Sequence, residues 1–160
     1  MLLRKPATNK MTGLTLLETM FALAVGAFVL LAAIILYKSI TLNSNVNQVM
    51  NDMNTIRAGY KNYFVSGYTF NAADDAAQLL AVQNAGFLPS TLNDPWGLPY
   101  FVSVANSHYP GKIIIGIPGL DLSSKDPRCN AIWKAAQTIG AQSTNYSWVG
   151  YNCAFQYRFP

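Results

Sequence analysis

The chain has 160 residues, which suffices for one ordinary domain with at most one appendage. Hydrophobic residues make up 51% of it and charged residues only 11%, well under the roughly 25% of charged residues in soluble proteins. The net charge is +4, but Arg4, Lys5 and Lys10 all precede Gly13. Without these three, 8 basic residues (11 minus 3) face 7 acidic ones, a balance of +1. The other basic residues are scattered, so we expect no nucleic-acid-binding face and interpret the leading charges as a targeting signal.

An uncharged apolar segment of eighteen residues, TMFALAVGAFVLLAAIIL, occupies positions 19–36. This length fits a transmembrane helix of about 17–25 residues and exceeds the roughly 7–15 apolar residues of a signal peptide. Basic residues precede it and only Lys38 follows closely, so the positive-inside rule predicts a cytoplasmic N-terminus and export of everything after Tyr37. Glu18 stands at the edge of the segment. Its carboxylate costs up to about 2–3 kcal/mol on insertion unless it lies among headgroups or finds a partner.

The residues between the basic leader and the apolar segment, Gly13 to Glu18, read GLTLLE. This string resembles the type IV prepilin signature. The resemblance implies that a membrane-embedded prepilin peptidase cleaves between Gly13 and Leu14 and then N-methylates Leu14. It also implies that the Glu18 carboxylate neutralises the Leu14 amine of a neighbouring subunit. Such pairing has a physical basis, because it removes the cost of two unpaired charges in a low-dielectric environment and fixes the axial stagger of the helices.

The resemblance also implies an organisation, a location and a set of partners. Residues 1–13 form the leader, 14–37 a transmembrane and polymerisation helix, and 38–160 an exported head that includes an amphipathic continuation of that helix. The protein is expected in the inner membrane before assembly and in an extracellular fibre afterwards. The implied partners are other copies of itself, the peptidase and methyltransferase, and an inner-membrane assembly platform with its cytoplasmic ATPase.

Beyond the membrane segment, apolar positions recur at steps of three and four, which predicts an amphipathic helix packed against a sheet. Gly67 is expected to end it, so that one helix runs from Leu14 to about residue 66. The apolar positions are Leu42, Val46, Val49, Met53, Ile56, Tyr60 and Tyr63 or Phe64.

A second helix is predicted to begin at Asn71 as its N-cap and to close at Gly86. Its carboxylates, Asp74 and Asp75, suit the dipole of the first helical turn better than they suit acid–base catalysis. The segment 94–100, DPWGLPY, resembles a turn found in major pseudopilins and many pilins, with a proline and a glycine setting the tight backbone.

Strands are expected at 100–104 and 112–117, separated by a loop that holds the lone His108, to which we assign no catalytic or ligand role. A third helix is predicted to start with Asp126 as N-cap and Pro127 as its first residue, and to end near Gly140. The alternating stretch 153–159 predicts a half-buried final strand. The expected class is α+β: a long N-terminal helix on a small antiparallel sheet, with a short helix in the connection.

Cys129 and Cys153 lie 24 residues apart with no further metal ligand nearby. They predict one disulfide in an oxidising compartment, with two buried free thiols as the alternative. A bridge would join the third helix to the last strand, and it resembles the C-terminal disulfide loop of pilins, whose enclosed residues form the exposed filament surface. The enclosed set here includes Trp133, Lys134, Tyr146, Trp148 and Tyr151.

Three functions remain open from the sequence. The leucine at the first mature position, the thirteen-residue leader and the absence of proline between Leu14 and Leu88 favour a type IVb-like pilin used for adhesion, conjugation or motility. The turn at 94–97 favours a pseudopilin of a secretion system, a class that often binds calcium through late acids, of which this chain has only Asp121 and Asp126. A membrane-anchored ligand-binding or enzymatic head would need a constellation of polar pocket residues that the sequence does not show. We therefore expect a structural subunit without enzymatic activity, metal or cofactor.

Overall fold

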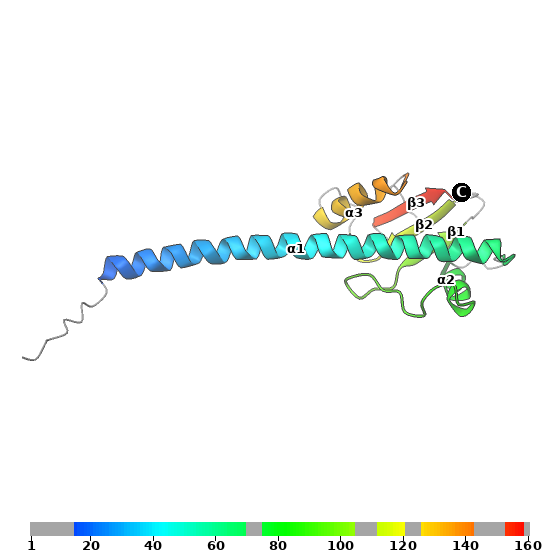
Figure 1. The fold of residues 1–160 in the computed structure, drawn as a ribbon, viewed down its shortest axis with the longest axis horizontal. Coiled ribbons are helices and arrows are strands. Elements are labelled where there is room, and N and C mark those ends of the chain that lie inside the picture. The colour runs from blue at the N-terminus through cyan, green and yellow to red at the C-terminus, as the bar shows by residue number, and fades with distance from the viewer. Residues whose placement is uncertain (1–14, 70–74, 105–111, 121–125, 143–152, 159–160) are drawn as a thin grey trace, which may run out of the picture. The chain divides into compact units, whose positions relative to one another are not determined.

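The computed structural model describes residues 15–69, 75–104, 112–120, 126–142 and 153–158. The elements in chain order are α1 (Leu16–Val65), α2 (Asp75–Asn84), β1 (Phe101–Val104), β2 (Lys112–Ile117), α3 (Pro127–Thr138) and β3 (Cys153–Arg158) (Figure 1). The chain divides into two compact units, residues 1–40 and residues 41–160, and we refer to the second as the head. The predicted α+β class is confirmed.

In the head, α1 buries one stripe along its length, as its periodicity predicts. The buried residues of the helix are Val46, Val49, Met53, Ile56, Gly59, Tyr60 and Tyr63. They join a single hydrophobic core with residues from all three strands, from α2 and from α3. Burial of this stripe supplies the free energy that holds the second half of α1 in the head, at about 25 cal/mol per Å² of apolar surface.

The predicted helix ends at Gly67 and Gly86 are confirmed. Gly67 has φ +84° and Gly86 has φ +80°, a left-handed backbone that suits glycine. After α1, the Gly67 N–H donates to the Phe64 carbonyl and the Tyr68 N–H donates to the Tyr63 carbonyl, at 2.9 and 3.3 Å. This is the Schellman arrangement, and the Tyr68 ring completes it by stacking on Tyr63 with centroids 4.8 Å apart.

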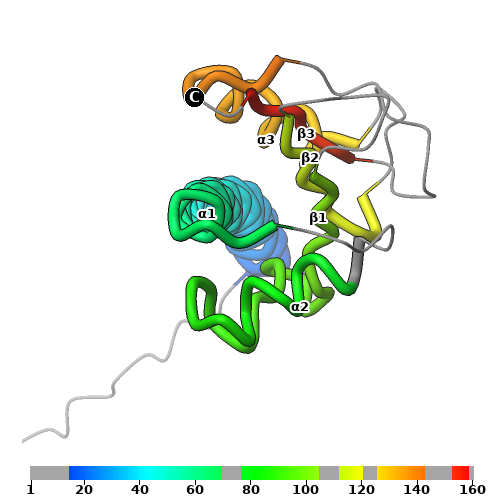
Figure 2. The backbone as a smooth tube through the Cα atoms, turned by 90° about the vertical axis from the view of Figure 1, so that its right-hand side faces the viewer, coloured from blue at the N-terminus to red at the C-terminus, as the bar shows by residue number. Residues whose placement is uncertain are grey.

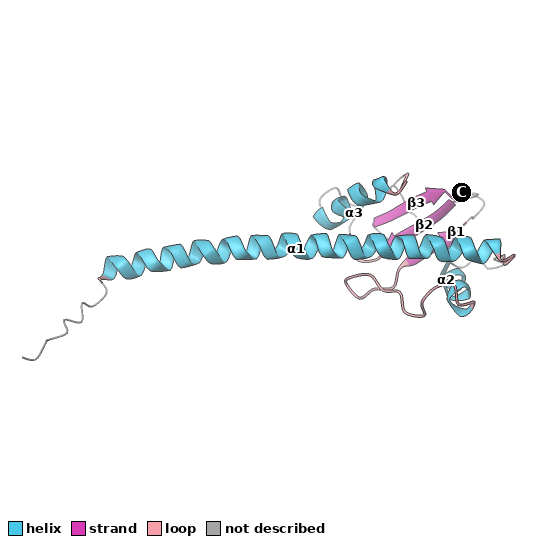
Figure 3. Cartoon of the chain, viewed as in Figure 1, coloured by secondary structure: helices cyan, strands magenta, loops and turns pink. Residues whose placement is uncertain are grey.

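The three strands form an antiparallel sheet in the order β1-β2-β3 (magenta in Figure 3). In the register, Ile115 faces Val102 on one side and Phe155 on the other, and Ile113 lies between Val104 and Tyr157. These rows share one face of the sheet. The Tyr157 hydroxyl donates to the Met53 sulfur at 3.3 Å, so this is the face that packs against α1.

The last strand corrects one prediction. The alternating pattern predicts a half-buried strand, with Ala154 and Gln156 on a solvated face. In the structure both are buried, at 3% and 2% exposure, like their neighbours Phe155 and Tyr157. Alternation of side-chain polarity marks one apolar face, but it does not reveal that the opposite face is covered as well.

The two shorter helices cover the two edges of the sheet, α2 at β1 and α3 at β3 (Figure 2). Gln78 of α2 is buried, and its side-chain oxygen accepts the Val104 N–H at 3.1 Å, which satisfies one donor of the edge strand. At the opposite edge, the Gln142 N–H donates to the Gln156 carbonyl at 2.9 Å. Both edges are therefore partly occupied from within the chain, a common protection against unwanted strand pairing.

The predicted start of α3 is confirmed. Asp126 is its N-cap, with its side chain accepting the Arg128 N–H at 2.9 Å, and Pro127 is its first residue. In α2, Asp75 is the first residue. The predicted N-cap Asn71 and its neighbour Asp74 lie outside the described residues, as does His108.

Candidate functional site

Glu18 lies in the first turn of α1 and is exposed. The residue before the helix, Thr15, is its N-cap: the Thr15 hydroxyl oxygen accepts the Glu18 N–H at 3.3 Å. The spacing Thr15-x-x-Glu18 is that of a capping box, a sequence signal for this helix start that the prediction of a helix from Leu14 overlooked. The helix dipole stabilises a negative charge in the first turn, so the ionised Glu18 side chain is favoured at this end of α1. The predicted cleavage and methylation residues, Gly13 and Leu14, lie outside the described part of the chain.

The first half of α1 exposes large apolar side chains on every side. Leu17 is 81% exposed, Phe28 is 73% exposed and Leu36 is 63% exposed, and residues 20–40 are all classed as exposed. Contiguous apolar surfaces of more than a few hundred Å² mark sites that bind a membrane or another protein. By length and composition this helix is apolar enough to cross a membrane, which is compatible with a membrane anchor or a signal segment.

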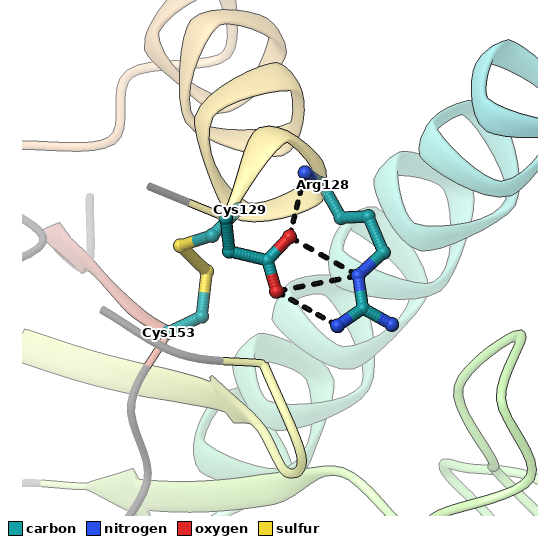
Figure 4. The surroundings of a disulfide bond; sticks show 4 residues. Arg128, Cys129 and Cys153 are labelled. Atoms are coloured by element: carbon teal, nitrogen blue, oxygen red, sulfur yellow. Dashed lines mark hydrogen bonds and ion pairs between the residues drawn. A yellow bond between two sulfur atoms is a disulfide. The ribbon is translucent and has the colours of Figure 1, made fainter. Parts of the chain in front are cut away.

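The predicted disulfide is present between Cys129 and Cys153 and joins the first turn of α3 to the first residue of β3 (Figure 4). Cys129 is 7% exposed and Cys153 is fully buried, so the bridge belongs to the core of the head. The alternative of two free thiols is excluded. In the chain-entropy view a bridge closing a loop of this length stabilises a fold by roughly 3 kcal/mol.

Beside the disulfide, Arg128 pairs with the N-cap of its own helix and contacts Trp96 of the turn at 94–97. The Arg128 guanidinium forms a 2.8 Å ion pair with Asp126 and lies 5.5 Å from the centre of the Trp96 ring. Arginine over the face of an aromatic ring is a favourable arrangement. Figure 4 shows the Arg128 side chain beside the bridge, directed away from the sulfur atoms.

The turn itself is organised by Asp94, which is 3% exposed. One of its carboxylate oxygens accepts the N–H groups of Trp96 at 3.0 Å and Leu98 at 2.8 Å. Its own N–H donates to the Leu98 carbonyl at 2.7 Å, and the Gly97 N–H donates back to the Asp94 carbonyl at 3.0 Å. The predicted tight turn is thus confirmed, although the sequence-based interpretation credited the proline and glycine and overlooked the aspartate.

A second carboxylate links α1 to the end of this turn. The Tyr100 hydroxyl donates to Asp52 of α1 at 2.9 Å. Burial raises the pKa of Asp52, although the hydrogen bond from Tyr100 acts in the opposite direction. Burial also raises the pKa of Tyr100, with a further contribution from the charges of Asp52 and Asp94. The phenol therefore stays protonated and remains a donor throughout the physiological range.

The cationic side chain of Arg57 connects α1 to the opposite edge of the sheet. Arg57 lies 4.4 Å from the centre of the Tyr157 ring and donates to the Ile139 carbonyl at 3.1 Å, at the C-terminal end of α3. Burial raises the pKa of Tyr157 to about 12, while the Arg57 charge opposes the shift. Neither this contact nor the Asp52–Tyr100 bond was predicted, because each joins residues far apart in the sequence.

The predicted aromatic surface within the disulfide loop is only partly described. Trp133 is half-buried and stacks on Phe155 with ring centroids 6.2 Å apart, so it belongs to the edge of the core, while Lys134 is exposed. Tyr146, Trp148 and Tyr151 lie outside the described residues. Among the described residues no group of three metal-ligating side chains occurs, and Asp126 is engaged with Arg128. Asp121, the other late acid, is not described.

Comparisons with protein-family models, with curated proteins and with solved structures find no match for this chain. Its function must therefore be inferred from its own residues. They provide an exposed apolar helix with a carboxylate at its start, followed by a folded head closed by a disulfide.

Proposed function

We propose that this chain is a type IVb-like pilin, a subunit that polymerises into a surface fibre through the first half of α1. The observation that carries the proposal is the all-round apolar exposure of residues 20–40, with Glu18 at the helix start. Exposure of such an apolar surface to water is unfavourable, and its transfer to an apolar environment lowers the free energy. A bilayer would cover it before assembly, and the same segment of neighbouring copies would cover it in the fibre.

Glu18 supports the proposal because it is the one acidic residue of the helix before Asp52. A carboxylate placed in an apolar assembly is costly unless it is paired. Cleavage after Gly13 would create a positive amine on Leu14, four residues away. Pairing that amine with Glu18 of an adjacent copy would neutralise both groups and set the spacing between subunits.

The disulfide supports a location outside the cytoplasm for the head, since disulfides persist in oxidising compartments. In this proposal the head is a structural element of the fibre surface and performs no catalysis. Its implied partners are other copies of the chain, the peptidase that processes Leu14, and a membrane platform powered by a cytoplasmic ATPase.

Mass spectrometry of the mature N-terminus tests the processing step. The expected result is a chain that begins at Leu14 and carries one methyl group on its amine. A mature protein that retains Met1 would contradict the proposed family.

Substitution of Glu18 tests the assembly step. We expect Glu18→Ala to be cleaved and inserted normally, but to yield at least about tenfold fewer fibres, because the Leu14 amine of the neighbour is left unpaired in an apolar environment. Asn84→Ala, which trims an exposed side chain at the end of α2, outside the proposed assembly helix, serves as the control and should assemble. Fibre yield can be measured from sheared surface material. Normal assembly of Glu18→Ala would refute the charge pairing.

A pseudopilin of a secretion system is the second candidate, favoured by the confirmed turn from Asp94 to Gly97. A pseudopilin would use the same helix and the same processing, but would form a short periplasmic piston. Electron microscopy of surface fibres labelled with an antibody to the head separates the two. Labelled fibres are expected for the pilin, and unlabelled fibres would favour the pseudopilin.

A further inference from the structure

The solvent-facing side of α1 within the head carries a line of carboxamide side chains. Four asparagines occupy it at steps of four, four and three, and all are exposed. At about 100° per residue these four lie within an arc of roughly 80°, on the side of the helix opposite the buried stripe. We name them the amide stripe: Asn43, Asn47, Asn51 and Asn54.

The side chains of the amide stripe do not contribute to hydrogen bonding within the described part of the chain. The four side chains make no hydrogen bond to another described residue; Asn51 is engaged only through its backbone carbonyl, which accepts the Thr55 hydroxyl. Asparagine is also a poor helix former compared with the alanine, glutamate, lysine and arginine that usually cover a solvated helix face. Neither helix stability nor packing within the head accounts for four asparagines in line.

The amide stripe itself carries no charge, and the first charged residue in line with it is Lys61, seven residues beyond Asn54. From Asn43 to Val65, a stretch that the structure describes throughout, Lys61 is the one exposed residue with a charge. The two other charged residues there lie at the flanks and are partly buried: Asp52 accepts from Tyr100, and Arg57 contacts Tyr157. From Asn43 to Asn54 this face is polar and uncharged, so its burial costs less than burial of a charged face would.

We propose that the amide stripe docks against α1 of a second copy of this chain. The inference rests on the proposed fibre, in which identical helices run side by side. In such an assembly every residue meets copies of the same surface, so a charged stripe would face its own charge and be repelled. A carboxamide has both donors and an acceptor and can pair with another carboxamide. Buried asparagines in parallel helices also fix register, at some expense of stability.

The test changes the charge at the centre of the stripe while keeping the side chain exposed. Asn47→Asp and Asn47→Lys each place like charges on adjacent helices. Each variant alone is expected to reduce fibre yield at least about tenfold, as expected for like charges brought together across an interface. Co-expression of the two is expected to restore the yield, because opposite charges then alternate. Normal yield with either variant alone, or no recovery on co-expression, would overturn the proposal.

Two controls separate docking from other causes. Asn84→Asp places the same charge at an exposed position at the end of α2 and should assemble normally; an equal loss there would overturn the proposal. The thermal unfolding of the head should be the same for Asn47→Asp and the wild type, because Asn47 makes no contact that the change removes.

Failure of the fibre hypothesis has a distinct outcome. If the wild type forms no fibre and Leu14 is not methylated, the proposed function fails. Chemical cross-linking of the full chain in its own membrane then still tests the stripe. Dimers lost in Asn47→Asp and recovered by co-expression with Asn47→Lys would support docking, whereas dimers unaffected by Asn47→Asp would refute it.

Discussion

The two halves of α1 form one helix but differ in what stabilises them. From Leu16 to Ile40 nearly every side chain is apolar and exposed, whereas from Leu42 to Val65 a single apolar stripe is buried and the remaining surface is mainly polar. The second half has its stabilising partners within the chain, in the sheet and in α2 and α3. The side chains of residues 20–40 are all exposed, which fits the proposal that a bilayer or neighbouring copies cover them.

This difference shows that apolar content alone does not locate a core. The more apolar half of the helix is the exposed half, because a sheet can bury only one side of a helix and this half is apolar on all sides. The periodicity of the apolar residues, more than their number, decides which half folds with the head.

The largest effect is expected from a matched pair of truncations, one in each half. Ile56 is fully buried, so Ile56→Ala should lower the free energy of unfolding of the head by about 2–5 kcal/mol. Leu30 is 66% exposed, and Leu30→Ala should leave it unchanged within about 0.5 kcal/mol. Denaturant unfolding of the full chain in detergent measures both. An equal loss of unfolding free energy in the two variants would show that the head is stabilised by both halves of α1.

Of the two halves of α1, only the second should be destabilised when the disulfide is lost. Cys129→Ser should lower the stability of the head by roughly 3 kcal/mol. Hydrogen exchange of the amides of residues 42–65 should accelerate in membranes, while that of residues 20–36 should not change. The double variant Cys129→Ser/Cys153→Ser controls for wrong pairing of the freed thiol. An unchanged melting profile would show that the bridge is dispensable for the head.

Gly59 offers a sharper test of how closely the second half of α1 is packed. A Cβ atom at this position would lie 2.5 Å from a methyl group of Leu88 and 2.8 Å from the Phe87 carbonyl oxygen. Gly59→Ala should therefore destabilise the head by about 1–3 kcal/mol, despite the better helix propensity of alanine. Gly26 lies in the first half with open space around it. Gly26→Ala should leave the head unaffected, and a stabilising Gly59→Ala would contradict the close approach.

The smallest effect is expected at the Asp52–Tyr100 bond. Tyr100→Phe should cost about 1 kcal/mol, the usual net contribution of one hydrogen bond. The raised pKa of Asp52 means that the folded head binds this proton more tightly than the unfolded chain. The resulting stability is present below pH 3.8, the ordinary value, and is lost as the pH rises through the folded-state pKa.

Thermal unfolding between about pH 3 and pH 7 tests this sign. The wild type should lose stability relative to Asp52→Asn as the pH rises, and the two curves should run parallel once Asp52 is ionised in both states. A wild type that gains stability relative to Asp52→Asn over the same range would show that the hydrogen bond outweighs the burial.

Much of the fold could be predicted because its determinants are local. The extent of α1, its end at Gly67, the Asp126–Pro127 start of α3 and the strand Lys112–Ile117 each follow from a few adjacent residues. The candidate site at Glu18 was equally visible, since a charge beside an apolar segment needs no tertiary information. The burial of Ala154 and Gln156 was not, because coverage of a strand depends on segments distant in the sequence.

Short stretches of residues are enough to predict most of the helices and strands, the point at which α1 changes from apolar to amphipathic, and the two cysteines that can pair. Three contacts arise only when the chain folds: Asp52 meets Tyr100, Arg57 lies over Tyr157, and Gly59 approaches Leu88 so closely that it has no room for a side chain. Local choices follow from the backbone preferences and polarity of neighbouring residues. Contacts between distant residues follow from how all the elements fill one core, which no short stretch of sequence specifies.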